Sequence, residues 1–322
     1  MKRAFINTKF QQKVLDIIDQ ANAIIAKYAA QGLTLTVRQM YYRFIAMDLF
    51  PATWIDEKYN RRWNLSPNTK NTLKNYKRLA AILNNGRMCG LIDWDAIEDR
   101  TRWLREYDTF NDPQQRLTSI AHGYIEDAWR DQENYCEVWV EKDALTGVIE
   151  KPCNELRVPY IPTRGYLSQS EAFTAGERIR AMANAGKNVV IFHFGDHDPS
   201  GLDMSRDNEE RLMLFGRQGS IDFRRLALNM DQVRQYNCPP NPAKETDSRF
   251  EMYQKEYGDD SWELDALEPS VISELVRANV ESLIHRPTFD AALSDEAENR
   301  DKLAKLEKHW PEVQTLLGMI EA

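Results

Sequence analysis

The sequence lacks a long apolar run. No stretch approaches the roughly 18 residues of a membrane-spanning helix, and the basic start, Met1 to Arg3, is not followed by the apolar core of a signal peptide. We therefore expect a cytoplasmic protein that makes no membrane contact. With 322 residues, of which 42% are hydrophobic and 29% charged, the chain is long enough for two domains.

Cysteine is scarce, and the glycines form no nucleotide-binding loop. The chain has four cysteines: Cys89, Cys136, Cys153 and Cys238. They form no C-x-x-C pair, which argues against a zinc site and against a disulfide framework. His193 and His197 have no histidine or cysteine partner at ligand spacing, so we expect both to be structural. Without a glycine-rich phosphate loop, any ATP-dependent step requires a separate ATPase subunit.

Charge is divided unevenly along a chain whose net charge is −8. Residues 1–134 carry 20 lysines and arginines against 16 acidic residues, a net charge of +4, whereas residues 135–322 carry 22 against 34, a net charge of −12. A basic front half can supply the phosphate contacts that dominate DNA affinity, and an acidic second half can attract cations. Ordinary variation of the protein surface is the alternative.

Two carboxylates follow a predicted buried strand. The apolar run from Asn188 to Phe194 is typical of such a strand, and Gly195 ends it. Asp196 and Asp198 then lie at its carboxyl end, where open α/β sheets bind their ligands. Paired carboxylates suit Mg²⁺, a hard cation that prefers oxygen ligands. Alternatively, the two aspartates cap a turn and begin the next helix.

A second predicted strand, Tyr135 to Val140, ends on Glu141 and is followed by a helix. A third strand and turn occupy residues 160–168, with a helix over 171–185. Strands that alternate with helices predict a parallel sheet. The carboxyl ends of these strands then place Glu141 beside the two aspartates. Farther along the chain, the polar, proline-bearing residues 241–260 are predicted to be a loop, and residues 288–322 a charged helix pair.

The front half is predicted to be helical. An amphipathic helix over residues 8–30 suits packing or dimer contact. Thr36 caps a second helix over 37–48. A third helix is predicted over 68–88, and its basic side chains include Lys74, Lys77 and Arg78.

A short wing strand is predicted over residues 91–95. Residues 36–102 then form a winged helix-turn-helix, of the CAP-like kind, whose third helix lies along a DNA groove. A solvated basic face on that helix is the alternative.

The helix over residues 37–48 carries two adjacent tyrosines. Residues three and four apart share a helix face, so Tyr41 is expected in the core and Tyr42 beside Arg38. A cationic neighbour can bind a phosphate and favour the phenolate, the form in which tyrosine is a good nucleophile and which its ordinary pKa of about 10 disfavours at neutral pH. A purely structural tyrosine–arginine pair is the alternative.

A strand ending in glutamate, a helix, and a later strand ending in G-D-x-D resemble the Toprim domain of topoisomerases, primases and some nucleases. The resemblance implies that Glu141, Asp196 and Asp198 hold Mg²⁺, for which Mn²⁺ can substitute. The motif D-H-D-P-S-G, at residues 196–201, resembles the D-x-D-P-x-G motif of the topoisomerase VI A subunit and its meiotic double-strand-break relatives.

The R-x-x-Y-Y stretch is similar to that of the same family, in which the second tyrosine attacks DNA. It implies that Tyr42 is the nucleophile and Arg38 its phosphate partner. W-E-L-D-A-L, from Trp262 to Leu267, resembles the family's E-x-x-A-L stretch. Arg164 matches a T-R that follows a strand in the family and can hold a phosphate or a carboxylate, with a surface salt bridge as the alternative.

The expected protein is thus an α/β chain with a helical N-terminal part. A winged-helix domain with the candidate tyrosine occupies residues 1–134, and a Toprim domain with a C-terminal helical extension occupies 135–322. The family resemblance, strongest to short stand-alone A-subunit homologues, implies Mg²⁺-dependent cleavage of double-stranded DNA through a 5′-phosphotyrosyl link. It also implies a homodimer, because tyrosine and metal come from different protomers. The alternatives are a hydrolytic nicking nuclease and a non-catalytic DNA-binding factor.

Overall fold

A four-stranded parallel sheet forms the centre of the second half, as predicted. In a computed structural model that describes residues 2–97, 107–216 and 221–320, the strand order is β2-β1-β3-β4. The strands are β1 (Asn134–Val140), β2 (Tyr160–Pro162), β3 (Asn188–Phe194) and β4 (Ile221–Ala227). Val140 pairs with Phe194, so β1 and β3 end side by side, and the residues that follow them meet at one edge of the sheet.

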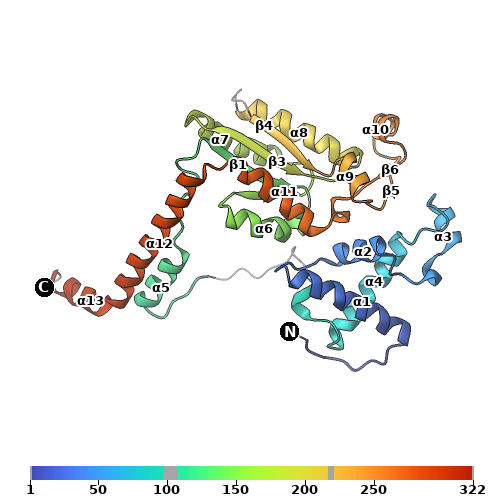
Figure 1. The fold of residues 1–322 in the computed structure, drawn as a ribbon, viewed down its shortest axis with the longest axis horizontal. Coiled ribbons are helices and arrows are strands. Elements are labelled where there is room, and N and C mark those ends of the chain that lie inside the picture. Colours follow the sequence, from blue (N-terminus) through green and yellow to red (C-terminus); the bar gives the residue numbers. More distant parts are fainter. Residues whose placement is uncertain (1, 98–106, 217–220, 321–322) are drawn as a thin grey trace.

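Helices cover both faces of the sheet (Figure 1). Alternate side chains of β1 and β3 point to opposite faces. Trp139, Val189 and Ile191 pack under α7 (Gln169–Asn184) and α8 (Pro199–Gly216). Val138 and Phe192 belong to a larger core that reaches α6 (Thr146–Glu155), α11 (Pro269–Glu281) and the N-terminal helices.

The N-terminal part is helical, with α1 (Gln12–Ala29), α2 (Val37–Ala46), α3 (Glu57–Arg62), α4 (Leu73–Met88) and a 3₁₀ turn over Ala52–Trp54. The predicted cap of the second helix is present as a reciprocal pair. The Gln39 amide donates to the Thr36 hydroxyl at 3.2 Å, and the Thr36 amide donates to Gln39 Oε1 at 2.8 Å. The predicted third helix begins later than residue 68, because Thr72 caps α4 by accepting from the Asn75 amide at 3.1 Å.

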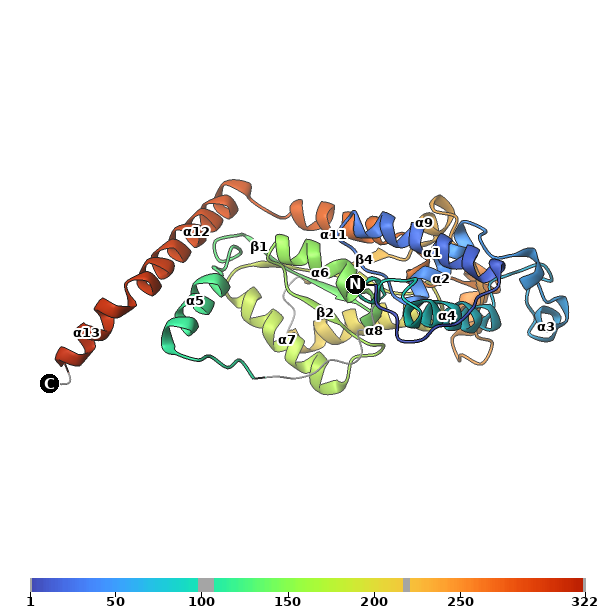
Figure 2. The same cartoon turned by 90° about the horizontal axis from the view of Figure 1, so that it is seen from below.

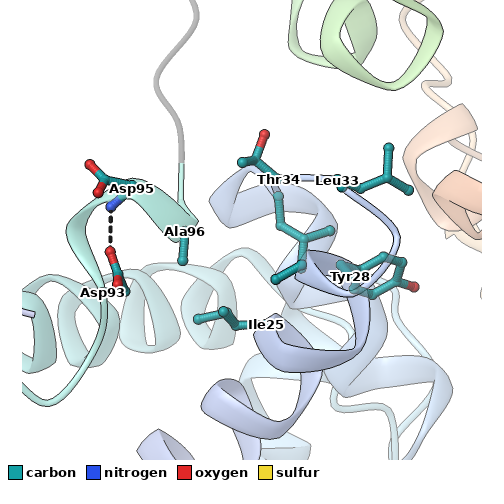
Figure 3. A pocket seen from close by; sticks show the side chains of 10 residues that line it. Ile25, Tyr28, Leu33, Thr34, Asp93, Asp95 and Ala96 are labelled. Carbon is teal, nitrogen blue, oxygen red and sulfur yellow. Dashed lines mark hydrogen bonds between the residues drawn. The ribbon is translucent and has the colours of Figure 1, made fainter. Parts of the chain in front are cut away.

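The predicted wing strand over residues 91–95 is wrong. Within the described residues 91–97 the chain forms a 3₁₀ turn, Trp94–Ala96, in place of a strand. Asp93 Oδ1 accepts from the Asp95 amide at 2.9 Å, the dashed bond in Figure 3, and this local bond turns the chain out of the extended conformation. A cavity of about 410 Å³ lies beside this turn, against α1.

The prediction of a loop over residues 241–260 is wrong in part. This segment contains a helix, α10 (Phe250–Tyr257). The helix lies between β5 (Asn241–Pro242) and β6 (Asp260–Ser261), two short strands that pair as an antiparallel hairpin. The predicted C-terminal helix pair is present as α12 (Arg286–Lys308) and α13 (Trp310–Ile320). Together with α5 (Pro113–Gly123), α12 and α13 form an arm that extends away from the sheet (Figures 1 and 2). The remaining helix is α9 (Met230–Gln235). None of the helices described is both long and apolar enough to cross a membrane.

Candidate functional site

The structure places two of the three predicted carboxylates next to each other at one edge of the sheet. Glu141 follows β1 and Asp196 follows β3, and the Asp196 amide donates to Glu141 Oε2 at 2.9 Å. Asp198 turns toward the start of α8. Its Oδ1 accepts from the Gly201 amide at 2.6 Å and from the Ser200 hydroxyl at 3.0 Å. The alternative role as a helix cap is therefore realised for this carboxylate.

A tight turn fixes the position of Asp196. A Cβ on Gly201 would lie 2.2 Å from the Asp196 carbonyl oxygen, which explains why the D-x-D-P-S-G stretch ends in glycine. From the other side, the buried guanidinium of Arg225 donates to the carbonyls of Gly195 at 2.9 Å and Asp196 at 2.6 Å. The loop between β3 and α8 is thus held by its own backbone and by a cation of β4.

Lys142 lies at the centre of the acidic residues. Its ammonium is 2.9 Å from Asp196 Oδ2. It also lies 3.0 Å from Glu263 Oε2 and 2.8 Å from Asp265 Oδ2. The Leu264 amide donates to Asp196 Oδ1 at 2.7 Å, so both oxygens of this carboxylate are engaged. One lysine therefore partners three carboxylates that come from two separate segments.

The predicted nucleophile lies next to this cluster. Tyr42 is 2% exposed, and its hydroxyl accepts from Asn241 Nδ2 at 3.0 Å. Arg38 has its guanidinium 5.9 Å from the centre of the Tyr42 ring. The same guanidinium forms a bidentate pair with Glu263, at 3.1 Å through Nε and 2.9 Å through Nη2. Arg38 thus lies beside Tyr42, as predicted, with a carboxylate as its partner.

Tyr42 and Asp196 are connected within one chain. Asn241 Nδ2 lies 3.0 Å from the Tyr42 hydroxyl and 3.5 Å from Glu263 Oε1, and Glu263 contacts Lys142, which contacts Asp196. We call these five residues the Tyr42–Asp196 network. It joins α2, the end of β1, the end of β3 and the β5–β6 hairpin.

The surroundings of Tyr42 disfavour the phenolate in this conformation. Burial raises the pKa of Tyr42 well above its ordinary value, and the negative charge of Glu263 raises it further, against the opposing effect of Arg38. The expectation that Arg38 favours the phenolate is therefore outweighed by burial. In this state the hydroxyl keeps its proton unless a base removes it.

The carboxylates near the sheet edge are also perturbed. Burial raises the pKa of Asp196 to about 7, with Lys142 opposing this effect and Glu141 adding to it. Burial likewise raises the pKa of Glu141 above its ordinary value, and the charge of Asp198 contributes. Acidic groups that are close together and shielded from water favour a shared proton or a bound cation.

The donors fit Mg²⁺ in kind, because all three predicted ligands are carboxylates. In position, Glu141 and Asp196 lie at one edge of the sheet, but Lys142 and the Leu264 amide engage both oxygens of Asp196, and Asp198 engages the start of α8 through one oxygen. Across residues 2–97, 107–216 and 221–320, no group of three or more histidine, cysteine, aspartate or glutamate side chains is placed to hold a metal ion as it stands. The three-carboxylate centre stays a prediction.

The predicted DNA-binding side chains of α4 are exposed. Lys74 forms an ion pair with Asp56, which caps α3. Arg78 lies 4.5 Å from the centre of the Trp54 ring, and Lys77 is exposed on the same helix. Their spacing of three and four residues places all three on one face of α4, outside the Tyr42–Asp196 network.

Arg164 is separate from α4 and follows β2. Its side chain is 58% exposed, and Nη2 lies 3.2 Å from Asp143 Oδ1. The surface salt bridge that the sequence left as an alternative is thus present. DNA binding by Arg164 stays a prediction.

Sequence reasoning missed several residues of the site. Glu263 lies in the W-E-L-D-A-L stretch, which carried a resemblance but no assigned role, and Lys142 directly follows Glu141. Asn241 falls in a segment predicted to be a loop, and Arg225 lies on the unpredicted β4. The usable signal was the charge pattern of two stretches, E-K-D after a predicted strand end and W-E-L-D beyond a predicted loop, which only the tertiary structure brings together.

Known proteins provide no template for this chain. No protein-family model, curated protein or solved structure matches it. Function is therefore inferred from the residues of this chain and from their geometry.

Proposed function

We propose that the protein cleaves duplex DNA in a Mg²⁺-dependent reaction in which Tyr42 attacks a backbone phosphate. The product is a 5′-phosphotyrosyl link and a free 3′ hydroxyl. The observation that supports this function is the Tyr42–Asp196 network, which connects the candidate nucleophile to the candidate metal ligands within one chain.

Each side chain of the site has a role under this proposal. Glu141, Asp196 and Asp198 would hold Mg²⁺, which when bound neutralises the phosphate and stabilises the leaving 3′ oxygen. Arg38 is 40% exposed and presents a guanidinium beside Tyr42, so it binds a phosphate oxygen once it exchanges Glu263 for DNA. Lys142 offsets the mutual repulsion of Asp196, Glu263 and Asp265 by pairing with each of these three carboxylates.

DNA can reach Tyr42 only after a local rearrangement. The hydroxyl is covered by Asn241 of the β5–β6 hairpin, and Asn71 of the N-terminal part contacts the Asn241 side chain at 2.8 Å. These are single hydrogen bonds between neutral groups, each worth about 0.5–1.5 kcal/mol net, which phosphate contacts can replace. Under the proposal, DNA binding moves this hairpin away from Tyr42.

A second candidate function, hydrolytic nicking, is favoured by the burial of Tyr42 and by its raised pKa. In that reaction an activated water attacks the phosphate, the same carboxylates hold the metal, and Tyr42 packs between the two halves of the chain.

The first test is nicking of supercoiled plasmid. We expect wild-type protein to nick in Mg²⁺ or Mn²⁺ and to stop when EDTA is added. Asp196→Asn combined with Asp198→Asn should lose at least about 100-fold in rate, the scale seen when an electrostatic stabiliser is removed from an active site. The fold should survive, because Lys142 keeps its contacts with Glu263 and Asp265.

The matched control is Asp222→Asn, which removes an exposed carboxylate on β4 and should nick at the wild-type rate. Thermal unfolding shows whether each variant is folded. Nicking by the folded double variant at the wild-type rate would contradict a role for these carboxylates.

A further inference from the structure

Glu263 is an acidic residue of the network to which the mechanism above gives no chemical role. Its side chain is 22% exposed and lies between two cations, Arg38 on α2 and Lys142 after β1. Both of its oxygens are engaged, Oε1 by Arg38 and Oε2 by Arg38 and Lys142. The carboxylate is therefore fixed in place and surrounded by positive charge.

The same carboxylate is a neighbour of the Tyr42 hydroxyl. Asn241 Nδ2 approaches both groups, at 3.0 Å from the hydroxyl oxygen and 3.5 Å from Glu263 Oε1. Lys142 and Arg38, together with hydrogen bonding from Tyr42, hold the pKa of Glu263 below its ordinary value despite burial. At neutral pH the carboxylate is ionised and can accept a proton, and it becomes a stronger base once Arg38 exchanges it for DNA.

Other carboxylates of the site are less well placed. Asp265 and Asp196 contact the Lys142 ammonium, but neither has a hydrogen bond or ion pair with Arg38 or Asn241 among the described residues. Glu263 is the acidic side chain that contacts both Arg38 and Asn241, the two groups found against the Tyr42 ring and hydroxyl.

We propose that Glu263 is the general base that takes the proton of Tyr42 during attack, an inference that rests on the proposed function. As the Tyr42 O–H bond breaks, its proton passes to the Glu263 carboxylate and its oxygen forms a bond to phosphorus. The bond from phosphorus to the 3′ oxygen breaks, and that oxygen leaves as the 3′ hydroxyl after taking a proton from solvent. Glu263 later returns its proton to solvent, and no group is oxidised or reduced.

A base is needed because Tyr42 is buried. A phenol with a raised pKa is a poor nucleophile unless its proton is removed as the bond forms, and a positioned base typically contributes about 10²–10⁴-fold. Lys142 orients the Glu263 carboxylate, and this contact remains when Arg38 turns to the DNA phosphate and Asn241 moves away from the hydroxyl.

The test measures covalent adduct formation against pH. The full-length protein is mixed with Mg²⁺ and a labelled DNA duplex that carries a nick, so that cleavage releases a short strand and traps the adduct. At pH 7 we expect Glu263→Gln to form adduct at least about 100-fold more slowly than wild type. Its rate should then rise about tenfold per pH unit, because without the base the reaction depends on the phenolate.

Two measurements separate this role from a structural one. Glu263→Gln should bind the duplex at least as tightly as wild type, since it removes a negative charge, and it should unfold at a similar temperature. If Glu263→Gln does not fold, Glu263→Asp replaces it, because aspartate keeps the charge between Arg38 and Lys142 but withdraws the oxygens by one methylene. The aspartate variant should then show slower adduct formation with unchanged DNA affinity.

The outcomes distinguish the two proposals. Adduct formation by a folded Glu263 variant with the wild-type rate and pH profile overturns the base assignment and leaves the nucleophile intact. Nicking by wild-type protein with no adduct overturns tyrosine attack, and the base assignment with it.

Discussion

At the scale of single residues, His193 is a buried histidine that stays neutral. It lies on β3, fully buried, with Nδ1 3.1 Å from the Ser205 hydroxyl. Burial lowers the pKa of His193 to about 3, and the nearby charge of Arg225 lowers it further. Below pH 6.5 this imidazole therefore binds a proton in the unfolded chain but not in the folded chain, so the free energy of unfolding decreases as the pH falls.

Because of His193, we expect the free energy of unfolding to decrease by about 1.5 kcal/mol when the pH falls from 6.5 to 5. Urea unfolding at the two pH values measures the loss. His193→Phe should remove most of it, whereas His122→Asn, a change at an exposed histidine of α5, should leave the loss unchanged. An equal pH dependence in wild type and His193→Phe would contradict the buried neutral histidine.

The positions of the site residues could be predicted where they depend on the local sequence. Glu141 and Asp196 were placed correctly at one sheet edge, because strand ends and parallel pairing determine their positions. The burial of Tyr42 and the contacts of Lys142 were not predictable, because they depend on a segment more than 100 residues away in the chain. The local sequence pattern gives no sign that Glu263 lies close to Tyr42 and Lys142.

At the scale of elements, α4 presents the basic surface on which DNA binding is predicted. We expect duplex DNA to bind without strong sequence preference and with an affinity that falls steeply with salt. Replacing Lys74, Lys77 and Arg78 together by alanine should weaken binding and reduce the slope of log affinity against log salt by about 2 to 3, since each lost phosphate contact contributes about 0.9.

Fluorescence anisotropy over a range of salt concentrations provides the slope. The matched control replaces Lys302, Lys305 and Lys308 on α12, three basic residues of another helix, and should bind like wild type. A salt-independent affinity, or equal binding by the α4 variant and wild type, would exclude α4 as the DNA surface.

The elements themselves were partly predictable. Regular apolar periodicity and a Thr36 cap predicted α1 and α2. An alternating pattern predicted β1, and a continuous apolar run predicted β3. The edge strand β4 was missed, because Asp222, Arg224 and Arg225 break its apolar pattern. The wing strand was wrong because Asp93 bonds its own backbone two residues on, a local preference that outweighed the apolar residues Leu91 and Ile92.

At the scale of the whole molecule, one segment joins the two halves. Residues 262–268 contact the sheet edge through Leu264 and contact the N-terminal helices through Glu263 and Glu268. Arg43 Nη1 pairs with Glu268 Oε1 at 2.6 Å, and the Arg43 guanidinium also donates to the Ala266 carbonyl. The family resemblance implied that tyrosine and metal come from different protomers, whereas here Tyr42 and Asp196 connect within one chain. The homodimer stays a prediction.

Under the proposed function, Tyr42 is positioned by this junction and attacks DNA. The most direct test of this attack is recovery of a protein–DNA adduct after incubation with duplex DNA and Mg²⁺, denaturation, nuclease digestion and peptide mass spectrometry. We predict a 5′-phosphorylated nucleotide on Tyr42, no adduct with Tyr42→Phe, and most of the adduct retained with Tyr41→Phe. Tyr41 serves as the control because it is equally buried, with its hydroxyl bonded to the Thr72 amide at 2.7 Å. Nicking by Tyr42→Phe at the wild-type rate, with Mg²⁺ dependence intact and no adduct on Tyr42 in wild type, would contradict the proposed attack.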